Sequence, residues 1–76
     1  MIHLREDILK SQIAYYNGKI AKHKQNVEVF MQKPVGVAEH PDHLETIEKE
    51  LKIIAEYDDQ LEMLNKYFVV KDPFKS

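Results

Sequence analysis

The chain has 76 residues, of which 43% are hydrophobic and 32% charged, with a net charge of −2 and no cysteine. A chain of this length forms at most one domain with a thin core, and the missing cysteines exclude disulfides and thiolate metal sites. No apolar run approaches the roughly 20 residues of a membrane span, and residues 1–7 lack the apolar stretch of a signal peptide. We therefore expect a soluble, cytoplasmic protein with no membrane partner, stabilised by self-association or by docking on a larger protein.

Charge is distributed unevenly between the two halves of the chain. Residues 1–33 carry six basic and three acidic side chains, whereas residues 34–76 carry five basic and ten acidic ones. Opposite net charges attract, which favours a fold that places the two halves side by side. The same balance leaves little positive field for nucleic acid, which we do not expect as the main partner.

A regular apolar repeat in the first half predicts a helix over about residues 4–32. Its members are spaced alternately by four and three residues, which is the pattern of a coiled-coil seam. They are Leu9, Ile13, Tyr16, Ile20, His23, Val27 and Phe30. Asn17-Gly18 could instead mark a β-turn, but the repeat continues in phase through it. We interpret Gly18 as a weak point inside the helix.

A short connector over residues 33–40 separates this helix from the next one. Pro34 cannot donate a backbone hydrogen bond and ends the first helix, and Gly36 permits a turn. Pro41 then supplies a favoured first helical position. A connector this short forces the two helices to run antiparallel.

The second helix is expected over about residues 41–67, followed by a tail over residues 68–76. Its predicted seam consists of Leu44, Ile47, Leu51, Ile54, Leu61 and Phe68. Asp58 and Asn65 fall at the alternate seam positions, where a polar residue can fix the register at a cost in stability. Alternatively the helix is rotated, so that Asp58 and Asn65 lie at the surface and Tyr57 and Leu64 turn inward. We prefer the rotation.

These elements predict an all-α fold, with a single domain over residues 1–76 built as an antiparallel, coiled-coil-like two-helix hairpin. A lone hairpin cannot cover the apolar residues outside its seams, so we expect a homodimer that completes a four-helix bundle. The surplus residues form the predicted interaction site: Ile8, Tyr15, Val29, Phe68, Val69, Val70 and Phe74.

Histidines mark two further candidate sites. His23 lies in the first seam, where it could titrate as a switch or bond a carboxylate of the second helix, such as Asp58. We prefer the structural role, because structural histidines outnumber sensors. His40 and His43 could hold a cation together with nearby acids if the side chains converge. A solvated loop and helix start explain the same residues, so we predict no metal site and no cofactor. The acids are Glu39, Asp42 and Glu45.

The main functional expectation is a protein–protein interaction module. The chain has no phosphate-binding loop, nucleophile elbow or Cys/His dyad, and a thin hairpin encloses no pocket, so we do not expect an enzyme. Lys19, Lys22 and Lys24 form a modest basic patch. A small nucleic-acid-associated regulator that uses this patch is therefore the alternative function.

Residues 26–68 also carry a family resemblance. The segments concerned are Asn26-Val27-Glu28-Val29, the connector from Pro34 to Asp42, Glu56-Tyr57-Asp58 and the run from Leu64 to Phe68. In these segments the chain resembles small uncharacterised helical proteins of tailed bacteriophages, in particular contractile-tailed phages of marine hosts. The resemblance implies a viral protein in a bacterial host cytoplasm, acting as a virion component or as an adaptor that binds a host machine.

Overall fold

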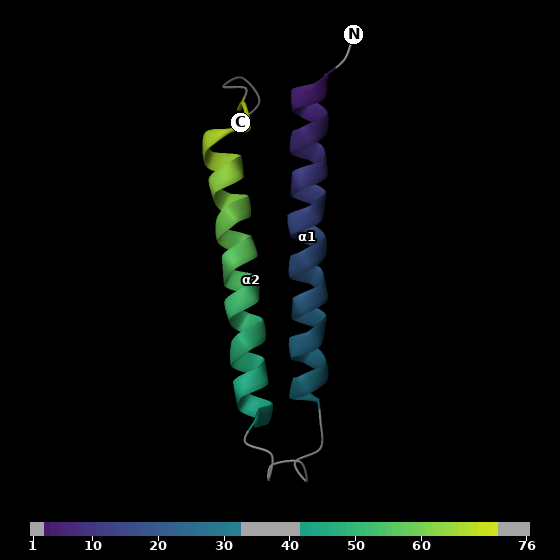
Figure 1. Ribbon diagram of the computed structural model, residues 1–76, viewed down its shortest axis with the longest axis vertical. Helices are drawn as coiled ribbons and strands as arrows, with labels where there is room; N and C mark the ends of the chain where they lie inside the picture. The colour runs from purple at the N-terminus through teal and green to yellow at the C-terminus, as the bar shows by residue number, and fades with distance from the viewer. Residues whose placement is uncertain (1–2, 33–41, 72–76) are drawn as a thin grey trace.

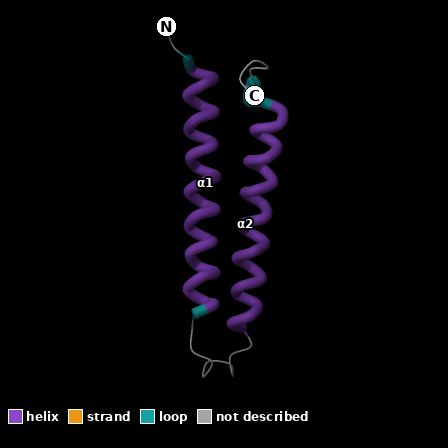
Figure 2. Tube along the Cα trace, turned by 180° about the vertical axis from the view of Figure 1, so that it is seen from behind, coloured by secondary structure: helices purple, strands orange, loops and turns teal. Residues whose placement is uncertain are grey.

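Two long helices lie side by side and run in opposite directions (Figure 1). In the computed structural model the described residues are 3–32 and 42–71, with α1 at Leu4–Met31 and α2 at Asp42–Tyr67. Within these ranges there is no strand, as the trace in Figure 2 also shows. The predicted all-α antiparallel hairpin is confirmed, whereas its assembly into a four-helix bundle stays a prediction.

The helix ends lie close to the predicted positions. α1 ends one residue before the predicted 32, and α2 begins one residue after the predicted 41 and ends at the predicted 67. The connector predicted at 33–40 lies outside the described residues, as do Pro41 and the end of the tail.

Local interactions stabilise both ends of α1. Glu6 and Asp7 occupy its first turn, where negative charge interacts favourably with the positive end of the helix dipole. At the other end, the Gln32 N–H donates to the carbonyls of Glu28 and Val29 at 3.2 and 3.3 Å. These bonds satisfy carbonyls that the end of a helix would otherwise leave without a partner.

Contacts between the helices define one continuous antiparallel register. The contacting pairs are Arg5 with Phe68, Tyr15 with Tyr57, His23 with Glu50, and Phe30 with His43. Their sequence separations fall steadily, from 63 to 42, 27 and 13 residues. Each step toward the end of α1 is thus matched by a step toward the start of α2, without a slip along the described length of the pair.

The predicted seam of α1 is confirmed by side-chain burial. All seven members are buried or half-buried, and among the described residues Tyr16 and Val27 are the two buried hydrophobic ones, at 9% and 8% exposure. Ile8 and Tyr15, which lie one position before seam residues, are exposed. The four-three spacing therefore identified the inner face of α1.

The predicted seam of α2 is half wrong. Ile47, Ile54 and Leu61 are half-buried as predicted, but Leu44 and Leu51 are exposed. Phe68, which follows the helix, is also exposed, at 57%. The observed inner row keeps Ile47, Ile54 and Leu61, and its alternate members lie one residue earlier than predicted. They are His43, Glu50, Tyr57 and Leu64.

The rotated alternative explains this correction. Tyr57 and Leu64 are half-buried, whereas Asp58 and Asn65 are exposed, so the preferred rotation is confirmed. Rotation keeps the carboxylate of Asp58 hydrated, and burying it without a partner would be costly. The same rotation moves Leu44 and Leu51 outward, because each lies one residue after an inward-facing position.

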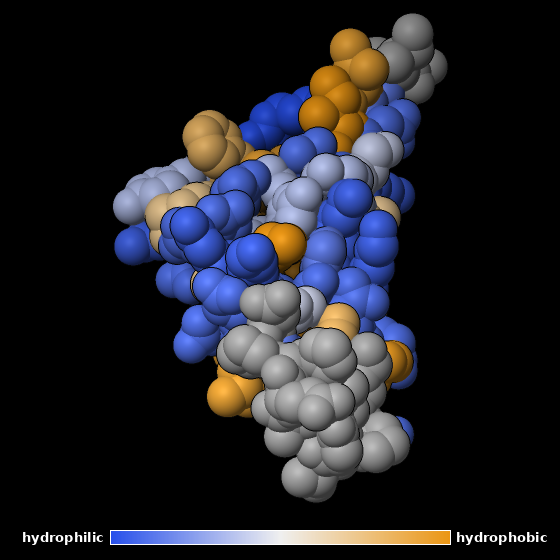
Figure 3. Space-filling model, turned by 60° about the horizontal axis from the view of Figure 1, so that its bottom comes forward, coloured by the Kyte–Doolittle hydropathy of each residue, from blue (hydrophilic) through white to orange (hydrophobic). Residues whose placement is uncertain are grey.

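The hairpin is one helix layer thick. Its principal extents are 58, 25 and 17 Å, and a helix with its side chains is about 10–12 Å wide. No described large side chain is fully buried, and apolar patches stand between hydrophilic residues on the surface (Figure 3). Among the described residues, neither helix combines the length and apolarity needed to cross a membrane.

Gly18 provides a test of helix propensity in α1. The helix runs through Asn17-Gly18 without a break, which excludes the β-turn, and a Cβ added at Gly18 meets no atom within 4 Å. We expect Gly18→Ala to raise the free energy of unfolding by about 0.5–1 kcal/mol, because glycine loses more backbone entropy in a helix. Thermal melting followed by circular dichroism measures the change. A lower melting temperature would contradict an open, regular helix at this position.

A charge placed inward should unfold the pair, and the same charge placed outward should not. We expect Ile54→Asp to destabilise the fold by about 2 kcal/mol or more, because it puts an unpaired carboxylate into the seam. Leu51→Asp is the matched control, since Leu51 is 50% exposed. Helicity is measured by circular dichroism, and mass by light scattering. Equal loss of helicity in both variants would show that the seam of α2 has been placed wrongly.

Candidate interaction surface

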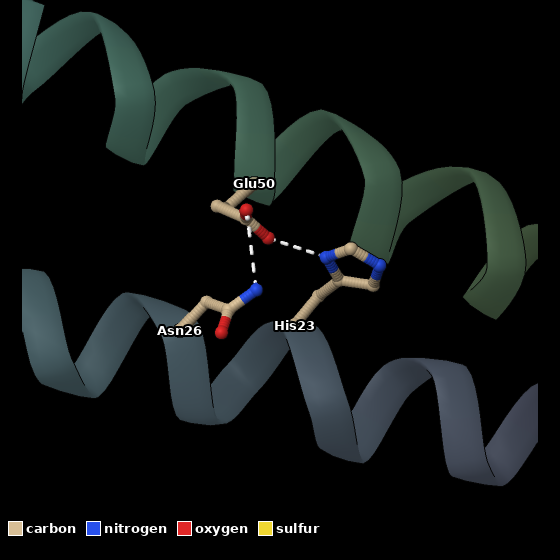
Figure 4. A network of polar contacts seen from close by, with 3 residues as sticks. All are labelled: His23, Asn26 and Glu50. Carbon is tan, nitrogen blue, oxygen red and sulfur yellow. Dashed lines mark hydrogen bonds and ion pairs between the residues drawn. The ribbon is translucent and has the colours of Figure 1, made fainter.

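A polar cluster interrupts the apolar seam near the middle of the hairpin. His23 and Asn26 project from α1 toward Glu50 of α2 (Figure 4). The His23 ring nitrogen Nδ1 is hydrogen-bonded to one Glu50 carboxylate oxygen, and Asn26 Nδ2 donates to the other at 3.3 Å. Both oxygens of the carboxylate are therefore satisfied across the interface, which makes its partial burial tolerable.

This cluster has the structural role preferred for His23, with Glu50 as the carboxylate. The side chains of His23 and Glu50 are only 13% and 16% exposed. The hydrogen bond from His23 lowers the pKa of Glu50, with smaller contributions in the same direction from Asn26 and from Lys22. Glu50 therefore favours its charged form in the folded pair.

Sequence reasoning missed Glu50 as a seam residue, because a charged side chain does not score as apolar. The signal was present in its spacing. Glu50 lies three residues after Ile47, four before Ile54 and seven before Tyr57. Treating a charged residue as a possible partner for His23 would have completed the inner row of α2.

Aromatic rings pack together next to this cluster. Tyr57 lies 5.9 Å from Tyr15, 6.1 Å from Tyr16 and 6.4 Å from His23, measured between ring centroids. The hydroxyls of Tyr15 and Tyr57 are 3.5 Å apart, and their hydrogen bond raises the pKa of the Tyr57 phenol. The Tyr15–Tyr57 pair is edge-to-face, an arrangement that contributes about 0.5–1.5 kcal/mol beyond area burial.

Three predicted interaction residues lie in one row along α1. Ile8, Tyr15 and Val29 are 57%, 48% and 50% exposed. They are seven and fourteen residues apart, so they share one side of the helix, and Lys22 fills the intervening position. Tyr15 reaches Tyr57 from this side, which places the row beside the seam rather than behind the helix.

α2 adds apolar residues to the same side of the hairpin. Ile53, Met63 and Tyr67 occupy the equivalent positions beside its seam, and the first two are half-buried. In an antiparallel helix pair, equivalent flanking positions of the two helices meet on one side. We call this surface the Tyr15 flank, and it consists of Ile8, Tyr15, Val29, Ile53, Met63 and Tyr67.

The opposite side is the Leu51 flank, and it differs in composition. An open recess there is lined by polar and charged residues of α1 as well as by apolar ones. We define this flank by its lining residues, which are Ala21, Lys24, Gln25, Val27, Glu28, Leu51 and Ile54. It contains no aromatic ring, so the Tyr15 flank is the better candidate for apolar binding.

The structure describes three of the four predicted tail residues, and two of these three are exposed. Phe68 and Val70 are 57% and 85% exposed, whereas Val69 is half-buried, and Phe74 lies outside the described residues. The Arg5 guanidinium donates to the Phe68 carbonyl at 2.6 Å and holds the end of α2 against the start of α1. Phe68 also lines a shallow recess with Leu4, Arg5, Ile8, Leu9 and Leu64.

Among the described residues, the side chains considered for a cation site do not converge. His43 Nε2 donates to the carbonyl of Phe30 at 2.7 Å, and its ring packs edge-on against the Phe30 ring. Glu39 and His40 lie outside the described residues. Within the described ranges, no group of three histidine or acidic side chains could hold a metal ion.

The three lysines of the alternative function do not form one patch. Lys19 is half-buried, with its ammonium 5.7 Å from the centre of the Tyr15 ring. Lys24 lines the recess of the Leu51 flank. Since five residues turn a helix by about 500°, the two point about 140° apart. Lys22 lies on the side of Lys19, so two of the three lysines share the Tyr15 flank.

Comparison with known proteins adds no assignment. No protein-family model, curated protein or solved structure matches the chain. The resemblance to phage proteins therefore stays a prediction.

Because the pKa of Glu50 is lowered in the folded protein, the direction in which its contribution to stability changes with pH can be stated. A carboxyl whose folded pKa lies below its ordinary value of 4.5 contributes stability that is present above that pH. The contribution is lost as the pH falls through the folded pKa. We expect the free energy of unfolding to decline below pH 4.5, and to decline less steeply in Glu50→Gln.

Urea unfolding of both proteins across this pH range measures the difference. Asp59→Gln is the matched control, because Asp59 is an exposed carboxylate of the same helix. Parallel pH profiles for wild type and Glu50→Gln would mean that Glu50 is not paired in the folded protein.

Proposed function

We propose that the chain is a non-enzymatic protein–protein interaction module that self-associates into an antiparallel four-helix dimer. One observation supports this most directly: a hairpin one layer thick leaves ten large hydrophobic side chains of the described residues between 48% and 85% exposed. Helices bury an apolar stripe against neighbouring layers, and two helices alone supply only one contact line. The exposed large hydrophobic residues are Leu4, Ile8, Tyr15, Val29, Met31, Leu44, Leu51, Tyr67, Phe68 and Val70.

The Tyr15 flank is the proposed binding surface. Interface centres are enriched in aromatic residues and methionine, and this flank combines two tyrosines with Met63. Covering half of a large apolar side chain contributes roughly 1 kcal/mol, so the four exposed residues of each copy contribute roughly 8 kcal/mol in a dimer. Association costs about 4–15 kcal/mol. The dimer is therefore expected to depend on protein concentration.

The biological setting of this module rests on the family resemblance. A small helical protein of a tailed phage would act as a virion component or as an adaptor directed at a host machine. Either role needs an apolar surface that recognises protein, as the Tyr15 flank provides, and neither needs a catalytic site. The nucleic-acid alternative has weaker support, because Lys24 lies on the other side of the hairpin from Lys19.

Two matched double variants test which flank mediates association. We expect wild type to have twice the chain mass of 9.0 kDa at high concentration. Ile8→Gln with Val29→Gln should shift the protein to monomer at least tenfold more readily on dilution, because the Tyr15 flank loses apolar area. Leu44→Gln with Leu51→Gln removes similar residues from the other side and should leave the mass unchanged.

Light scattering over a concentration series gives the mass, and circular dichroism checks that each variant stays helical. A wild-type monomer at every concentration would rule out self-association. A dimer that dissociates only with the Leu44/Leu51 variant would move the interface to the opposite side of the hairpin.

A further inference from the structure

We infer that the second copy packs on the Tyr15 flank with its α1 against α2 of the first, about a twofold axis parallel to the helices. This inference rests on the proposed self-association and adds its geometry. In this arrangement the C-terminal ends of both α1 helices lie at the same end of the dimer. The occupant of the flank is thus another copy of this chain, in one defined orientation.

Only two simple twofold arrangements pack one hairpin face on another. An axis parallel to the helices places α1 of each copy on α2 of the other. An axis across the helices places α1 on α1 and α2 on α2, with the two copies pointing in opposite directions. Both make neighbouring helices antiparallel, so helix direction alone does not choose between them.

Net charge distinguishes the two arrangements. α1 carries five basic and three acidic side chains, whereas α2 carries three basic and eight acidic ones. Stacking each helix on its own kind brings together two helices whose net charges have the same sign. Stacking α1 on α2 brings together helices of opposite net charge, which favours that orientation during encounter and in the complex.

The charged residues on the side of the Tyr15 flank also distinguish the two arrangements. Lys19 and Lys22 lie one and four residues after Gly18, which is near the midpoint of α1. With the axis across the helices, the midpoints of the two α1 helices coincide. Four ammonium groups, Lys19 and Lys22 from each copy, would then meet around the axis. Like charges this close to one another disfavour the arrangement.

With the axis along the helices, the register of the hairpin predicts which side chains meet. Tyr15 lies level with Tyr57. Lys19 is one turn beyond Tyr15, so it comes close to Glu56 of the second copy, an exposed carboxylate next to Tyr57. The two ends of the flank are also compatible, since Ile8 comes level with the segment that holds Met63 and Tyr67.

One basic residue of α2 is also on this side of the hairpin. Lys49 lies about two turns from Glu56, toward the start of α2, and approaches the level of Lys22. Glu45 stands four residues before Lys49, which is the favourable order for a helical ion pair. The proposed orientation therefore sets one approach of like charges, Lys22 with Lys49, against the Lys19–Glu56 match and the opposite net charges of α1 and α2.

A pair of distance measurements tests the orientation in the intact chain. The protein has no cysteine, so a single substitution to cysteine carries one spin label per chain. Gln32→Cys marks one end of α1, and Gly18→Cys marks its middle, where an added Cβ meets nothing within 4 Å. Double electron–electron resonance on each labelled dimer measures the distance between the two copies of that label.

The proposed arrangement predicts short distances, below about 35 Å, for both labels, because equal residues lie at one level and helices are about 10–12 Å wide. The crosswise arrangement keeps Gly18→Cys short. It separates the Gln32→Cys labels by about 42 Å or more, since fourteen residues on each side span about 21 Å.

A long Gln32→Cys distance with a short Gly18→Cys distance would overturn the orientation while leaving the proposed dimer intact. A monomeric mass for both labelled proteins and for wild type would overturn the orientation and the proposed self-association together. Two short distances in a protein of dimer mass support both. Light scattering on the same samples separates these results.

Discussion

The hydrogen-bonded contact between His23 and Glu50 is the constraint that makes the hairpin specific. Apolar seams alone tolerate sliding, because one aliphatic side chain can replace another along a groove. A shift of one turn would move Glu50 away from His23 and Asn26 and toward Ile20 or Val27, where its carboxylate would have no partner. Leaving a half-buried carboxylate without a hydrogen-bond partner in this way costs about 1–3 kcal/mol. This contact acts on the register together with the other contacts along the pair, which are Arg5 with Phe68, Tyr15 with Tyr57, and Phe30 with His43.

The sequence pattern was sufficient to place both helices and the inner face of α1. It was insufficient to place the inner face of α2, for a physical reason. The α1 seam contains only one polar member, His23, so its period is unambiguous. In α2, Leu44 and Leu51 stand next to the true inner positions His43 and Glu50, and hydropathy alone selects the leucines. The rotation that turns Tyr57 and Leu64 inward corrects the choice, and so does the pairing of Glu50 with His23 across the interface, which involves residues far apart in the sequence.

The candidate surface was predictable in part. Ile8, Tyr15 and Val29 stood out because they lie off the α1 seam at heptad spacing, and all three are exposed. The contribution of α2 to the same side was not predictable, since it depends on the rotation that places Ile53 and Met63 beside the seam. A thin hairpin with one apolar side has the form of half a four-helix bundle. In such a half, both the contact between the helices and the binding of a partner use apolar surface.

The contact between Arg5 and the end of α2 has a different consequence. Its acceptor is the backbone carbonyl of Phe68, so every amino acid at that position supplies the same oxygen. Mutational drift at position 68 can therefore change the side chain without touching this bond, whereas losing the Arg5 guanidinium or shortening α2 removes it. At this end of the molecule, the contact depends on the length of α2 and on one donor rather than on the identity of the residue that accepts.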